Sequence, residues 1–175
     1  MVVNGTEVKT GSGYAMDPAP MPPLPVNESS TILVGTFKDH QTYFSGDHSK
    51  IVSELDVQVE KILMDHSGIA NADTSVTVMT IGGTLKRADG RVFSVGAPLP
   101  PGKLSVGHRY VFFLEADKST QSFGLIKVWE LGSDGKVIPL HVFDTYAAAY
   151  GLLTLPSDEA SFLNTLNAEI ALRAR

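Results

Sequence analysis

The chain has 175 residues, of which 43% are hydrophobic and 19% charged, and its formal net charge is −5. A chain of this length suits one domain with an appendage, and the absence of cysteine excludes disulfide bonds, thiolate catalysis and cysteine-ligated metal sites. The scattered lysine and arginine residues argue against a nucleic-acid partner, because phosphate binding requires clustered positive charge.

Membrane insertion is not expected, because no run approaches the roughly 18 apolar residues that a membrane helix needs. The N-terminus lacks a basic segment followed by an apolar one, so no signal peptide is visible. The compartment stays open: the protein is intracellular, or the sequence begins after a removed leader.

Residues 1–30 are rich in proline and have no periodic apolar pattern. The run PAPMPPLP favours the extended polyproline II conformation. We therefore predict a flexible tail over 1–30 and a folded domain over 31–175, and removing the tail should leave stability unchanged. The tail is a spacer or a ligand for an aromatic groove that recognises PxxP segments.

The β-rich run at 31–38 predicts the first strand of the domain, and Gly35 inside it indicates a bulge or a close backbone approach. The polar stretch 39–50 predicts a loop or hairpin tip. From Glu54 to Glu60, apolar side chains alternate with polar, mostly acidic ones. This alternation predicts a half-buried strand with an acidic outer face.

The segment VGHRYVFFLE at 106–115 is the strand around which we expect the others to be arranged. Tyr110, Phe112 and Leu114 fall on one face of an extended chain, while Val111 and Phe113 fall on the other. A strand that is apolar on both faces is typical of one covered on both sides, as in a small barrel or sandwich.

Further strands are predicted from runs bounded by turn residues, at 75–81, 84–86, 91–95 and 124–131. The turn signal Ala88-Asp89-Gly90 makes the second and third of these a hairpin. In the last one, Trp129 is expected to be a core residue on the strand face that it shares with Leu125, Lys127 and Leu131.

The C-terminal part contains a short strand, an ambiguous segment and a helix. Because of Pro139, we expect the second half of the run 136–142 to be an edge strand or an irregular segment. The segment 144–155 has no clear assignment to a helix or a loop. A helix is predicted over 157–173, with Ser157 as its cap. Its apolar face repeats at helical spacing, at Phe162, Leu163, Leu166 and Ile170.

Three histidines follow an aspartate and are the obvious candidate metal ligands, at Asp39-His40, Asp47-His48 and Asp65-His66. Neighbouring side chains on an extended chain point apart, and the spacings match no standard zinc pattern. We therefore expect no metal site and no cofactor; convergence of the three histidines is the competing hypothesis. Nucleophile elbows, phosphate loops and the common metalloprotease motif are also absent, so we identify no catalytic residue.

The segments ILVGTF, SELDVQVEKIL, SVTVMTIGG, YVFFLE and GLIKVWEL, in this order over 31–131, carry a resemblance. The pattern resembles a group of uncharacterised bacterial domains, often exported, that contain a small β-barrel akin to the OB fold. It is also similar to the netrin-like modules of metalloproteinase inhibitors, although the cysteines that make the inhibitory contact in those modules are missing here. The resemblance implies a fold and no catalytic residues.

We therefore predict a mainly β protein: a small OB-like barrel or a strongly bent antiparallel sheet with one C-terminal helix. The predicted function is a non-enzymatic binding or interaction module, with a protein as the partner considered and Tyr43 and Phe44 as its candidate contact residues. Two hypotheses remain for Tyr43 and Phe44: they form an exposed contact site, or they fold back onto the domain as a small hydrophobic lid. The alternatives are a hydrolase or metal-dependent enzyme built from loops, and a structural domain of a larger envelope assembly.

Overall fold

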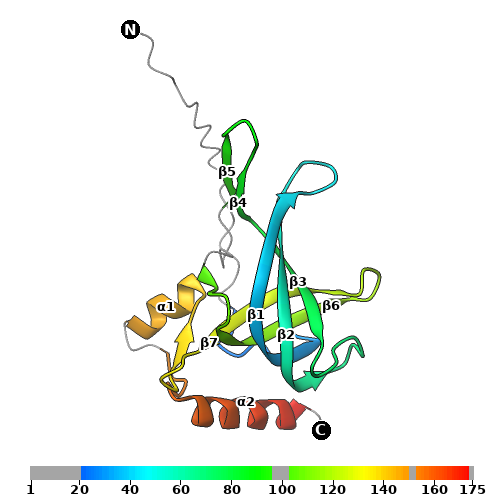
Figure 1. Cartoon of the computed structure of the whole chain (residues 1–175). Helices are drawn as coiled ribbons and strands as arrows, with labels where there is room; N and C mark the ends of the chain where they lie inside the picture. The colour runs from blue at the N-terminus through cyan, green and yellow to red at the C-terminus, as the bar shows by residue number, and fades with distance from the viewer. Residues whose placement is uncertain (1–20, 96–102, 150–152, 174–175) are drawn as a thin grey trace.

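The computed structural model describes residues 21–95, 103–149 and 153–173, and the following statements concern those residues. They form mainly β-structure with two helices, arranged as Figure 1 shows. The elements in chain order are β1 (Thr31–Phe44), β2 (Ile51–Asp65), β3 (Ser75–Ile81), β4 (Gly83–Lys86), β5 (Val92–Val95), β6 (Arg109–Asp117), β7 (Ser122–Leu131), β8 (Val137–Pro139), α1 (Val142–Ala149) and α2 (Glu159–Arg173).

The main sheet closes into a ring of five strands. Antiparallel pairing gives the order β3-β2-β1-β6-β7, and β3 then pairs with β7 in parallel at two positions, Val78 with Phe123 and Met79 with Gly124. Strand β8 adds to the other end of β7 as an edge strand that stops at Pro139, because proline cannot donate a backbone hydrogen bond. The fold is thus the small OB-like barrel expected from the sequence.

Strand β6 carries both hydrophobic cores, as its two apolar faces predicted. Tyr110, Phe112 and Leu114 belong to the core inside the barrel, while Val111 and Phe113 belong to a second core outside it. All five side chains are completely buried. Strand β2 also follows its prediction, because its alternating apolar residues, Leu55, Val57 and Val59, lie in the interior core.

Helix α2 covers the second core and lies across one end of the barrel in Figure 1. Phe162 and Leu166 are completely buried, and the Phe162 ring lies 5.5 Å from the Trp129 ring, between centroids. The helix begins at Glu159 rather than at 157. Its cap is Asp158 instead of Ser157, since the Ser161 N–H donates to Oδ1 of Asp158.

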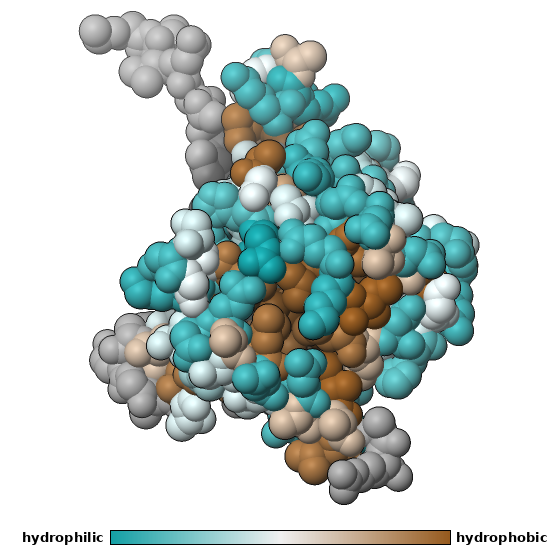
Figure 2. Space-filling model, turned by 60° about the horizontal axis from the view of Figure 1, so that its bottom comes forward, coloured by the Kyte–Doolittle hydropathy of each residue, from teal (hydrophilic) through white to brown (hydrophobic). Residues whose placement is uncertain are grey.

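On the side where α2 lies, hydrophobic residues gather in the middle of the face and hydrophilic residues surround them (Figure 2). The partly buried members of the second core include Leu63 and Met64 of β2 and Leu163 and Ile170 of α2. The contacts of this core thus join the helix to the strands beneath it.

The predicted boundary of the N-terminal tail is wrong for residues 22–30, and residues 1–20 lie outside the described part. Val26 is 3% exposed and belongs to the second core. The carbonyl of Pro23 accepts a hydrogen bond from the Trp129 indole at 3.2 Å. Residues 23–28 form bends and a turn, so carbonyl groups there are not used in a helix or a sheet ladder and can accept bonds from the barrel.

Two further local expectations need correction. Residues 39–44 are not a loop, because β1 continues to Phe44 and pairs with β2 as far as Ile51. Leu125 does not share a strand face with Trp129, because a bulge at Ile126 interrupts the pairing of β7 with β6. An inserted residue reverses the alternation of side chains, so Leu125 packs on the interior core whereas Trp129 lies in the second core.

Candidate functional site

The barrel is incompletely closed along the seam between β3 and β7. After the two parallel pairs, β3 continues through Thr80 and Ile81 without pairing to β7. Strand β7 in turn has no described strand partner on this edge from Leu125 until β8 joins it at Trp129. The diverging strands leave an opening in the wall of the barrel.

This opening is a groove with a cavity volume of about 580 Å³. We call it the seam groove, and its described lining consists of Lys50, Val52, Met79, Thr80, Ile81, Gly124, Leu125, Ile126, Lys127, Val128 and His141. Its volume lies within the range of roughly 300–1,000 Å³ that is usual for small-molecule sites.

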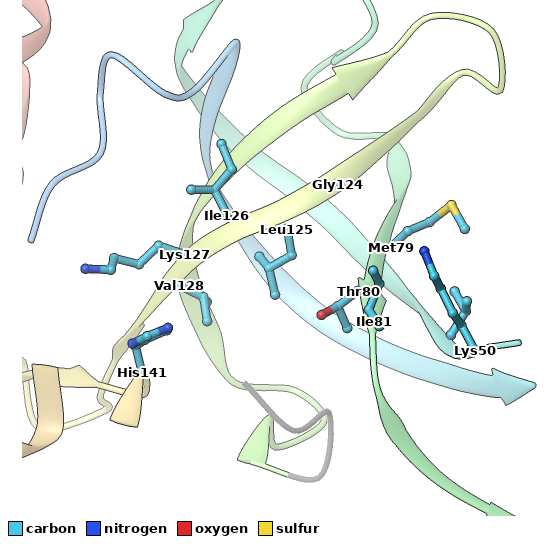
Figure 3. A pocket seen from close by; sticks show the side chains of 11 residues that line it. Lys50, Met79, Thr80, Ile81, Gly124, Leu125, Ile126, Lys127, Val128 and His141 are labelled. Carbon is cyan, nitrogen blue, oxygen red and sulfur yellow. The ribbon is translucent and has the colours of Figure 1, made fainter. Parts of the chain in front are cut away.

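The seam groove leads into the apolar interior of the barrel. Side chains alternate along β3, so Thr80 has the same orientation as Val76 and Val78, both of which belong to the interior core. On the opposite side, Val128 belongs to that core and Leu125 packs against it. Figure 3 shows the side chains of Thr80, Leu125 and Val128 between the two strands.

The charged side chains of the lining are all basic. Lys50 lies toward one end of the seam groove and His141 toward the other, with the apolar residues between them (Figure 3). Lys127 lies beside His141, and no aspartate or glutamate is among the described lining residues.

Lys127 is fully engaged by the protein itself. Its ammonium group lies 2.8 Å from Oδ2 and 3.1 Å from Oδ1 of Asp144, and it donates to the carbonyl of Pro22 at 2.8 Å. Burial of a charge requires such compensation, and the carboxylate of Asp144 and the carbonyl of Pro22 together provide it. Lys127 therefore ties α1 and the N-terminal segment to β7.

His141 is half-buried next to this ion pair. Burial lowers its pKa from the usual value; Asp144 opposes that shift, while Lys127 and Lys103 reinforce it. The neutral imidazole is thus favoured near neutral pH, which leaves Lys50 as the cation at the opposite end of the seam groove.

Tyr43 and Phe44 do not lie on a loop but at the end of β1, and neither lines the seam groove. The Tyr43 hydroxyl donates to Glu54 across the strand pair, and this bond raises the Tyr43 pKa. The Phe44 ring meets the Phe93 ring edge to face at 5.4 Å between centroids. Both side chains thus have intramolecular contacts, and their role in binding a partner stays a prediction.

The three Asp-His pairs lie in different settings. His40 is an exposed residue within β1, His48 is in the β1–β2 turn with a positive φ of 57°, and His66 follows the end of β2. Asp47 and Asp65 accept hydrogen bonds from nearby serine residues. In the described part of the chain, no three histidine or acidic side chains come together as a metal site would require.

The seam groove was not predicted from the sequence. Its lining comes from four separate segments: the β1–β2 connection with the start of β2, the end of β3, the middle of β7, and the residues after β8. Nothing in a local pattern says which strand closes a barrel, or where that closure fails.

The sequence matches no protein-family model and no curated protein at a significant level. Over the described residues, neither helix has the length and apolar character needed to span a bilayer. The candidate site is therefore identified from its geometry and chemistry alone.

Proposed function

We propose that this protein is a non-catalytic binding module and that its ligand site is the seam groove. The observation that carries the proposal is the opening of the interior core between β3 and β7, where Thr80, Leu125 and Val128 face a common space. Ligand sites are found preferentially in such apolar concavities with a few polar groups, including the mouths of β-barrels.

The side chains of the lining support binding rather than catalysis. Its apolar members can shield a ligand from water, and burial contributes about 25 cal/mol for each Å² of apolar surface. The buried pair Lys127–Asp144 is held by contacts within the fold. The position of this ion pair between β7 and α1 supports a structural role: it fixes the wall of the groove and the position of α1.

The proposal can be tested with a neutral apolar fluorophore, N-phenyl-1-naphthylamine, whose emission rises when it leaves water. We expect saturable binding to the full chain. Thr80→Trp should reduce this binding at least tenfold, because the larger side chain would occupy the seam groove. Thr77→Trp is the matched control, since Thr77 is an exposed residue of the same strand that does not line the groove.

Both variants should keep the melting temperature of the parent chain to within a few degrees, which separates loss of the site from loss of the fold. Equal binding by Thr80→Trp, Thr77→Trp and the parent would show that the fluorophore binds elsewhere. Absence of any saturable binding to the parent would contradict the proposed function.

A further inference from the structure

We infer that the seam groove selects a free amphipathic anion: a single unbranched hydrocarbon chain with one carboxylate, whose head group pairs with Lys50. This inference rests on the proposed function, because it assigns a class of ligand to the same site. It is carried by the distribution of apolar and charged side chains along the groove.

The shape of the groove favours an unbranched chain. The lining follows β7 from Gly124 to Val128, which corresponds to about 13 Å at roughly 3.3 Å per residue. Leu125, Ile126 and Val128 of β7 line one side, and Met79, Thr80 and Ile81 of β3 line the other. An extended hydrocarbon chain can lie between the two strands and bury part of its surface against each.

The charge of the lining favours a negative head group. A positively charged amphiphile would meet Lys50 and would find no carboxylate among the described lining residues. A carboxylate at the Lys50 end would instead form an ion pair with this exposed lysine, and the attraction adds a modest amount to the binding of the apolar chain. Complementary charge of this kind contributes to specificity as well as to affinity.

Lys50 is the cation available for this role. Lys127 already makes three contacts, to Asp144 and to the carbonyl of Pro22. The described contacts of Lys50 involve its backbone, which exchanges hydrogen bonds with Ser45. Its ammonium group forms no ion pair with any described residue. Lys50 is thus the accessible cation among the described lining residues, and it can pair with a ligand that carries one negative charge.

The experiment measures displacement of N-phenyl-1-naphthylamine from the full chain by decanoate, decanol and decylammonium, each below its micelle-forming concentration. We expect decanoate to compete about fivefold more strongly than decanol, the scale of a partly exposed ion pair, and decylammonium to be the weakest. Raising the salt concentration should narrow the difference between decanoate and decanol.

Lys50→Gln should abolish the preference for decanoate while leaving decanol competition unchanged, and Lys50→Glu should transfer the preference to decylammonium. Lys38→Gln is the matched control, because Lys38 is an exposed lysine of β1 that does not line the seam groove. Equal competition by decanoate and decanol, or equal effects of Lys50→Gln and Lys38→Gln, would overturn the inference and leave the proposed function intact. Failure of all three amphiphiles to displace a bound fluorophore would also overturn it.

Discussion

The ammonium group of Lys127 lies 2.8 Å from Oδ2 of Asp144, and their side chains are only 1% and 9% exposed. Lys127 projects from the central part of β7, whereas Asp144 lies in the first turn of α1. This pair joins the sheet to a helix that otherwise contacts mainly the short strand β8. A buried ion pair is strongly coupled, because loss of either member leaves the other charge without compensation.

Removal of one partner should therefore destabilise the protein more than removal of both. We expect Lys127→Met or Asp144→Leu alone to cost about 3–5 kcal/mol in unfolding free energy, and the double variant to cost less than either single variant. Urea unfolding of the four proteins in a double-mutant cycle measures this coupling. Additive costs would show that the two groups act independently.

The packing of residues 22–30 changes what deletion of the N-terminal segment should do. Deleting 1–29 removes Val26 from the second core and leaves Trp129 Nε1 without the Pro23 carbonyl. We expect a loss of at least about 2 kcal/mol, which corresponds to a fall of at least about 4 °C in melting temperature for a chain of this size.

The matched control is deletion of 1–20, which keeps every contact described for residues 22–30. Thermal unfolding followed by circular dichroism distinguishes the two deletions. If deletion of 1–29 left the melting temperature unchanged, the contacts of Val26 and Pro23 would be energetically unimportant.

Gly35 should not tolerate alanine, because β1 and β2 approach closely at this position. A Cβ atom on Gly35 would lie 2.6 Å from Cγ1 of Val57 and 2.8 Å from the backbone oxygen of Gln58. A backbone oxygen cannot move aside as a flexible side chain can, so we expect Gly35→Ala to cost about 1–3 kcal/mol.

Gly46→Ala is the corresponding control, since a Cβ atom there would meet nothing within 4 Å. Its effect should lie between no change and a gain of about 1 kcal/mol, because alanine restricts the unfolded chain. Chemical denaturation of both variants provides the comparison, and equal stabilities would contradict the close approach at Gly35.

His141 should make stability depend on pH below neutrality. Burial lowers its pKa in the folded protein, so between the unfolded value near 6.5 and the folded value the unfolded chain binds more protons. Stability due to this group is therefore complete above about pH 6.5 and declines as the pH falls below it. His141→Gln should reduce the difference in unfolding free energy between pH 7.5 and pH 5.5.

Asp144 opposes this shift, whereas Lys127 and Lys103 reinforce it. The comparison is consequently made between His141→Gln and the parent at the same two pH values, so that contributions of other groups cancel. An unchanged difference between pH 7.5 and pH 5.5 in the variant would show that His141 does not carry the dependence.

Local patterns predicted most of the strands, because burial of one or both faces of a strand requires apolar residues at regular positions in its sequence. Alternation at Leu55, Val57 and Val59 located β2, and the doubly apolar run around Phe112 located β6 and its place between two cores. Such patterns identify a strand but say little about where pairing is interrupted. The bulge at Ile126 reversed the face expected for Leu125, since one inserted residue costs little and leaves no distinctive composition.

The sequence by itself determined that this is a mainly β barrel with a C-terminal helix, because hydrophobic periodicity is a property of each segment alone. Only the tertiary structure decided that residues 22–30 belong to the folded protein, that Lys127 and Asp144 compensate each other, and that β3 and β7 diverge to form the seam groove. Each of these features joins residues that are distant in sequence, such as Pro22 with Lys127. The free energy of such a contact depends on pairing and burial across the fold, which no single segment encodes.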